Sequence, residues 1–176
     1  MIKFTCTAIT AALLFSTPVL AFDEADRAAV KATFDTLTTG IAEGDYDAVF
    51  STMSPALLAK MAEPTGLAPE AFKQIAVSQM KAAMAQVEIK EVTFDLDDMV
   101  LGTSSTGREY AVIDTVTRMT MAENNIKATG PALAYEDDDK WYVVQIQGPD
   151  QAAVLGAVYP DLAEVELPEG TMEIEE

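Results

Sequence analysis

Residues 69–96 read PEAFKQIAVSQMKAAMAQVEIKEVTFDL, and the spacing of the apolar side chains changes once along this stretch. Before Val87, apolar residues recur three or four positions apart, which predicts a helix that begins at Pro69. Beyond Val87 the spacing falls to two or three, so residues 89–96 are predicted to form a strand. The chain therefore changes at this point from a helical part to a part made of sheet.

Shorter helical patterns precede this stretch. Apolar side chains over residues 30–41 are spaced by four, three and four, which predicts an amphipathic helix that ends at the nearby glycines. Asp45 is placed to cap a short helix over residues 46–53. Ser54 and the proline after it provide a cap and a first-turn residue for another helix through Met61.

Strand patterns follow the change in spacing. Residues 109–121 are rich in Val, Ile, Thr and Tyr, and residues 126–136 and 141–147 continue the pattern after short polar turns. Pro131 lacks an N–H group and predicts an edge strand or a bulge. Helices followed by four mostly antiparallel strands indicate an α+β fold, a single domain in which N-terminal helices pack on a curved sheet.

Two segments carry a resemblance to a known family. Residues 34–50 contain a helix that ends in a Gly-Asp pair before a short helix, and residues 133–144 form a hairpin with Trp141 just after its turn. In these features the chain resembles the nuclear-transport-factor-two-like superfamily. The resemblance implies a cone-shaped sheet around a long helix, with a cavity that some members use for ketosteroid isomerisation, polyketide cyclisation or dehydration and others for noncatalytic binding.

The two ends of the chain differ from this central part. Residues 1–21 have one positive charge, a short apolar core and small residues before a polar segment, which predicts a signal peptide cleaved after Ala21 and a periplasmic or secreted protein. The α+β cone domain is expected over residues 22–149. Residues 150–176 are expected to form a short helix and an acidic tail, and the six glutamates from residue 164 onward predict poor order there.

Composition excludes several classes of function. The chain has no His, and Cys6 lies in the predicted signal peptide, so the mature protein has no Ser/His/Asp triad, Cys nucleophile, His or Cys zinc site or disulfide. The 11 Lys and Arg residues against 29 Asp and Glu give a net charge of −18, which argues against nucleic acid and anionic membranes as partners. No mature segment is apolar enough for membrane insertion. No phosphate-binding glycine loop or dinucleotide fingerprint is present, so no cofactor is predicted.

Four residues are candidates for ligand binding. Three of them lie four positions apart on one predicted strand and therefore point to the same face: Tyr110, Asp114 and Arg118. If that face is concave, a buried Asp114 would be a candidate base and Arg118 or a tyrosine would stabilise an oxyanion. The alternative is a charged pair on the solvent side or a structural ion pair, with the opposite face forming the core or a dimer contact. Tyr46 is expected at the rim, where it either contacts ligand or packs locally.

Two acidic clusters are candidate calcium sites by the chemistry of their side chains. Oxygen ligands are offered by Asp95 with Asp97 and by Asp137 with Asp139. In each cluster the next alternate position is an apolar residue, and the glycine that follows in a calcium loop is absent. The sequence therefore predicts no metal site.

The leading hypothesis is an exported noncatalytic module that binds a small apolar or amphipathic ligand or a partner protein. One alternative is a cavity enzyme of the isomerase, cyclase or dehydratase type that uses a buried Asp. Another is a structural envelope accessory protein, for which a homodimer is one arrangement. No catalytic residue can be named from the sequence.

Overall fold

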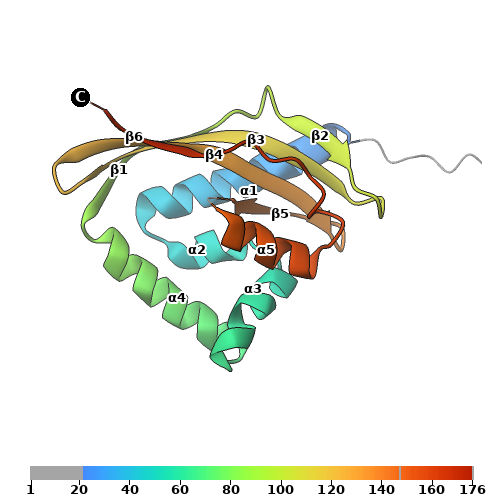
Figure 1. The fold of residues 1–176 in the computed structure, drawn as a ribbon, viewed down its shortest axis with the longest axis horizontal. Helices are drawn as coiled ribbons and strands as arrows, with labels where there is room; N and C mark the ends of the chain where they lie inside the picture. Colours follow the sequence, from blue (N-terminus) through green and yellow to red (C-terminus); the bar gives the residue numbers. More distant parts are fainter. Residues whose placement is uncertain (1–21, 147, 176) are drawn as a thin grey trace, which may run out of the picture.

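The computed structural model describes residues 22–146 and 148–175, so the predicted signal peptide lies outside the described residues. The helical elements are α1 (Glu24–Glu43), α2 (Tyr46–Ser51), α3 (Pro55–Ala62), the 3₁₀ turn η1 (Glu63–Thr65), α4 (Pro69–Met84) and α5 (Pro149–Val158). The strands are β1 (Val87–Phe94), β2 (Val100–Thr103), β3 (Glu109–Met121), β4 (Asn124–Asp137), β5 (Lys140–Gln145) and β6 (Thr171–Glu175). The predicted α+β class, with helices packed on a curved antiparallel sheet in a single domain, is confirmed (Figure 1).

The helix boundaries follow the predicted caps. The side chain of Asp23 accepts hydrogen bonds from the first turn of α1, and Gly44 ends that helix in the left-handed conformation, with φ of 68°. Asp45 caps α2 through the amide of Ala48, and Ser54 caps α3. These caps satisfy backbone N–H groups that have no partner within the helix.

The sheet is built around two long strands. β3 and β4 pair antiparallel along nearly their whole length. The other edge of β3 carries β1 beside its C-terminal half and β2 beside its N-terminal half. The other edge of β4 carries β6 and β5 in the same end-to-end manner, so four strands lie side by side at either end (Figure 1).

The prediction that Pro131 marks an edge strand or a bulge is wrong, because its pairing with Asp114 of β3 continues the register without a shift. Pro131 lies within β4, which has neighbours on both sides. The Pro131 carbonyl accepts from Ile146, so the proline nitrogen also faces the β5 and β6 side of the strand. Pairing with β6 stops at Thr129 and pairing with β5 starts at Ala132, so the missing N–H falls where one neighbouring strand replaces the other.

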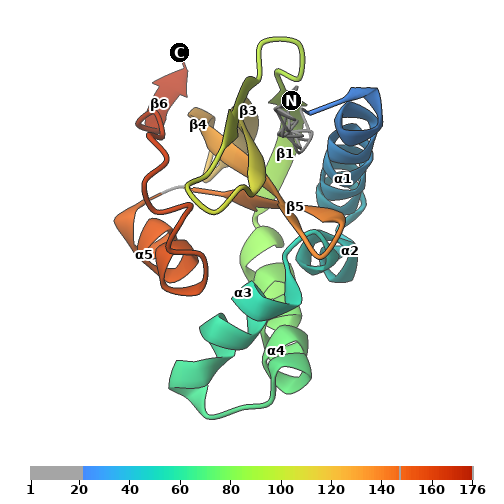
Figure 2. The ribbon, with the colours of Figure 1, turned by 90° about the vertical axis from the view of Figure 1, so that its right-hand side faces the viewer.

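Both faces of the sheet are covered near the β4–β5 hairpin. Figure 2 shows α1 on one side of the sheet and α5 on the other. On the α1 side, Val30, Phe34 and Leu37 pack against alternate residues of the sheet, including Ile113 and Val143. On the α5 side the core is formed by residues from α3, the sheet, α5 and the chain after it, namely Leu57, Val112, Leu133, Tyr135, Leu155 and Leu162.

The C-terminal segment is not the poorly ordered tail that its glutamates predicted. Tyr159, Asp161 and Leu162 are buried after α5, and residues 171–175 pair with β4 as β6. The chain reaches β4 through Gly170, where a Cβ atom would stand 2.9 Å from the carbonyl oxygen of Thr129. Glycine at this position therefore allows the close approach of the two backbones.

Candidate ligand-binding cavity

Two neighbouring cavities lie between the helices and the sheet, one beside β5 and the other against the inner face of β3 and β4. Their volumes are about 500 Å³ and about 540 Å³. We call the first the helix lobe and the second the sheet lobe. Both are lined by Leu37 of α1, Val49 of α2, Met80 of α4 and Gln145 of β5, so the two lobes adjoin.

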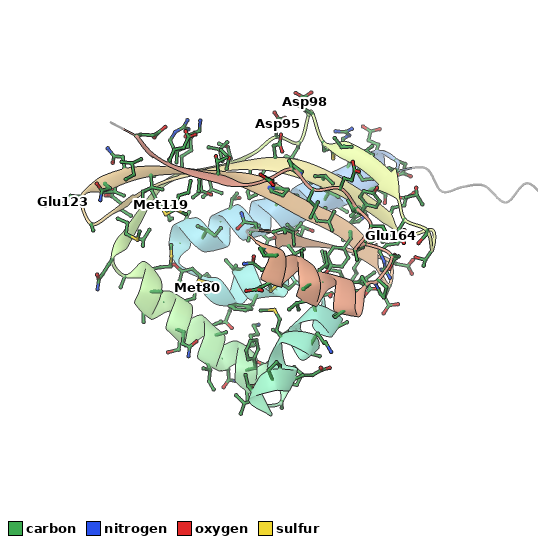
Figure 3. All side chains as sticks on the ribbon, in the orientation of Figure 1. Met80, Asp95, Asp98, Met119, Glu123 and Glu164 are labelled. Atoms are coloured by element: carbon green, nitrogen blue, oxygen red, sulfur yellow. The ribbon has the colours of Figure 1, made fainter. Side chains whose placement is uncertain are left out.

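The sheet lobe lies against the inner face of β3 and β4. Thr115, Thr117 and Met119 line it, because side chains two apart on β3 point to the same face. α4 lies across from this face, and Figure 3 shows Met80 on α4 and Met119 on β3 on opposite sides of the lobe. Thr171 of β6 contributes at the sheet edge, so the C-terminal strand forms part of the wall.

The helix lobe lies between α2, α3, β5 and the beginning of α5. Its inner wall is formed by buried side chains such as Phe50, Leu57 and Val143. Its outer rim includes Asp150 and Gln151 in the first turn of α5, which are exposed. The lobe therefore runs from a polar rim to an apolar interior.

The lining of both lobes is mainly apolar. Among the described residues that line them, Asp150 is the only one that carries a charge, and Tyr46 is the only other titratable group. The remaining polar side chains are threonines and glutamines. Several methionines, whose flexible thioether side chains adapt to different ligand shapes, line the lobes: Met53, Met61, Met80, Met84, Met119 and Met172.

Asp114 and Arg118 lie outside the cavity. Their face of β3 is the outer one, since Thr115, Thr117 and Met119 on the opposite face line the sheet lobe. Asp114 is exposed, and Arg118 forms ion pairs with Glu91 and Glu175. The hydrogen bond that Arg118 donates to Glu91, together with the negative charges of Glu91 and Glu175, raises the pKa of Arg118. The pair therefore occupies the solvent-side position that the sequence left open as an alternative.

The two tyrosines have different surroundings. Tyr110 is half-buried on the outer face of β3, where its ring packs over Gly102 of β2 and joins the core on the α5 side. Tyr46 is buried at the start of α2 and lines the sheet lobe. Of the four candidates, only Tyr46 reaches the cavity.

A buried polar network lies behind the helix lobe, and the sequence did not predict it. Ser54 is fully buried, and its hydroxyl oxygen lies 2.7 Å from that of Tyr159 and 3.1 Å from that of Tyr135. Tyr159 also donates a hydrogen bond of 2.8 Å to Asp137. Burial is the main cause that raises the pKa of Tyr159, so the phenol stays protonated.

This network continues to a charged group. Arg108 forms ion pairs with Asp137 and Asp161, and its guanidinium lies 4.6 Å from the ring centroid of Tyr159. Asp161 is buried. Burial opposes its ionisation, but hydrogen bonds from Ser104, Thr106 and Arg108 outweigh that effect and lower the pKa of the carboxyl. The only sequence signal for this network was the Tyr-Pro-Asp run at residues 159–161.

Carboxylates also gather at the start of α1. Glu109 is buried at the start of β3, and burial together with the charges of Asp26 and Glu136 raises its pKa. Asp26 accepts a hydrogen bond from the indole N–H of Trp141. No group of three carboxylates among residues 22–146 and 148–175 is arranged to hold a metal ion.

Asp95, one of the carboxylates that could have bound calcium, accepts hydrogen bonds from the amides of Asp97 and Asp98 and thereby closes a turn. Figure 3 shows Asp95 and Asp98 on the side of the sheet away from the helices. Within the described part of the chain, none of the helices is both long and apolar enough to cross a bilayer. No family model, curated protein or solved structure matches the chain.

Proposed function

We propose that this protein binds a small apolar or amphipathic molecule in the two-lobed cavity and does not act on it chemically. The observation that carries the proposal is the pair of adjoining, mainly apolar lobes. Their volumes lie within the range of about 300–1,000 Å³ that is typical of ligand pockets. The signal peptide pattern of residues 1–21 supports an exported binding protein, and the cone-like fold accords with the noncatalytic members of the superfamily that the sequence resembles.

The unfilled volume favours binding over a purely structural role. Protein interiors are packed to a density that leaves few voids larger than a water molecule. The α1 side of the sheet is packed in this way around Phe34 and Ile113. The helical side of Leu37, Val49 and Met80 instead borders open volume. A structural accessory protein would not require this space.

The residues that line the lobes favour binding over catalysis. General acid–base catalysis needs a titratable side chain within hydrogen-bond reach of the reacting group, and usually a second group that stabilises charge. Tyr46 lines only the sheet lobe, and Asp150 lines only the helix lobe. Neither lobe therefore combines an acid or base with a second charged group among its described lining residues.

Native mass spectrometry of the protein, purified gently from its own host, tests the proposal. We expect a defined extra mass that is lost on denaturation. Thr117→Trp, which fills the sheet lobe, should reduce that mass peak. Val116→Trp adds the same side chain to the outer face of β3 and should retain it. Equal occupancy in both variants would contradict binding in the sheet lobe, and a protein that neither carries a ligand nor binds apolar probes would contradict the function.

A further inference from the structure

The distribution of charge around the helix lobe indicates the kind of ligand that enters it. Asp150 is the only charged residue among the described residues that line either lobe, and none of them is Lys or Arg. A ligand carboxylate or phosphate in the cavity would therefore have no cationic side chain to pair with. A ligand cation at the rim would meet the carboxylate of Asp150.

The polarity of the lobe indicates how such a ligand would lie. Asp150 and Gln151 are exposed at the rim, whereas Leu57 and Val143 in the interior are buried. Gln145 lies where the helix lobe meets the sheet lobe. An apolar chain would bury its length against the interior, and its headgroup would stay at the hydrated rim.

The helix terminus at the rim does not reverse this preference. Asp150 lies in the first turn of α5, where the backbone dipoles amount to about half a positive charge. A full carboxylate charge exceeds that value. The chain as a whole has a net charge of −18, which attracts cations and repels anions at longer range.

We propose that the cavity binds an amphiphile with a cationic headgroup, held at the rim beside Asp150 with its apolar chain extending toward the sheet lobe. This inference rests on the proposed binding function and specifies the charge of its ligand. The order of affinity follows from the charge at the rim. For ligands with the same chain, a cationic headgroup binds more tightly than an uncharged one, and an anionic headgroup binds most weakly.

Isothermal titration calorimetry with three probes tests this order. Dodecyltrimethylammonium, dodecyl maltoside and dodecanoate share one chain length and differ in headgroup charge, and each is titrated below its micelle concentration at low salt. Because Asp150 is exposed, Asp150→Asn should weaken binding of the cationic probe by about three- to fivefold and leave the maltoside unchanged. Asp150→Lys should make dodecanoate the preferred charged probe.

Asp98→Asn is the matched control, because it removes the same charge from an exposed site on the far side of the sheet (Figure 3). If it weakens the cationic probe as much as Asp150→Asn does, the effect comes from net charge and the proposal is overturned. The proposal is also overturned if the unsubstituted protein binds dodecanoate as tightly as dodecyltrimethylammonium. In that case the binding function stands. If none of the three probes binds and the protein purified from its host carries no ligand, the binding function itself is wrong.

Discussion

The hydroxyl oxygens of Ser54 and Tyr159 lie 2.7 Å apart, although the two residues are 105 positions apart in the chain. Ser54 caps α3, which lines the helix lobe, and Tyr159 begins the C-terminal segment that leads to β6 in the wall of the sheet lobe. One buried hydrogen bond therefore joins the elements that form opposite parts of the cavity. Its loss would affect both stability and the shape of the site.

Tyr159→Phe should lower the free energy of unfolding by about 1–2 kcal/mol, measured by urea denaturation. The substitution removes hydrogen bonds to Ser54 and Asp137 without changing the volume of the ring. Tyr142→Phe is the control, since that tyrosine belongs to the same core and its hydroxyl has no hydrogen-bond partner among the described residues. Equal effects in the two variants would show that the network adds no stability.

Asp161 should make the protein less stable in acid. Its folded-state pKa is lowered, so its ionised form contributes stability that is present above the ordinary carboxyl pKa of about 4 and is lost as the pH falls through the folded value. Asp161→Asn should lower the free energy of unfolding by about 2 kcal/mol at pH 7. The loss is no larger because Arg108 keeps Asp137 as an ion-pair partner. Denaturation curves from pH 7 to pH 3 should show this difference shrinking. A constant difference would contradict the assignment.

Glu109 should have the opposite dependence on pH. Its folded-state pKa is raised, so its contribution to stability is fully present below the ordinary value and is lost as the pH rises through the folded one. Glu109→Gln should therefore stabilise the protein at pH 7 by about 0.5–1 kcal/mol, with the gain absent near pH 4. Glu123→Gln, at the exposed β3–β4 turn labelled in Figure 3, should leave thermal and urea stability unchanged. Destabilisation by Glu109→Gln at pH 7 would be the contrary result.

Much of the fold could be predicted because its signals are local. Caps such as Asp45 and Ser54 act within one helical turn, and the change in spacing at Val87 is visible in a short window. β2 and β6 were missed for a physical reason. β2 has only four residues, and β6 is exposed on both faces, with Met172 and Ile174 each 70% exposed, so neither buries a face that would produce a clear pattern.

The candidate site depended on which face of β3 is turned toward the helices, and the alternation of side chains along a strand does not determine this. The period of two correctly separated Asp114 and Arg118 from Thr115 and Thr117. It could not tell which set faces the helices, because the outer face also has apolar residues such as Val112. Those residues are covered by α5 and the chain after it, a contact between segments far apart in the sequence.

Gly170→Ala should loosen β6 while leaving the rest of the fold intact. The added methyl group would stand 2.9 Å from the carbonyl oxygen of Thr129, so the backbones must separate. Hydrogen–deuterium exchange of residues 171–175 should become faster, with a local cost of about 1–3 kcal/mol. Gly148→Ala is the control, because a Cβ atom there makes only an ordinary contact with Gln151. Unchanged exchange in Gly170→Ala would show that the strand tolerates the extra atom.

Asp114→Asn and Arg118→Ala should leave binding in the cavity unchanged, since both side chains lie on the outer face of β3. Arg118→Ala removes two exposed ion pairs and should change the stability of the protein very little, because solvent screens exposed ion pairs. Titration of each variant with dodecyl maltoside, alongside Thr117→Trp, measures the outcome. Only Thr117→Trp should lose affinity, because it alone changes the cavity wall. A loss of affinity in Asp114→Asn at unchanged stability would instead indicate that the outer face takes part in binding.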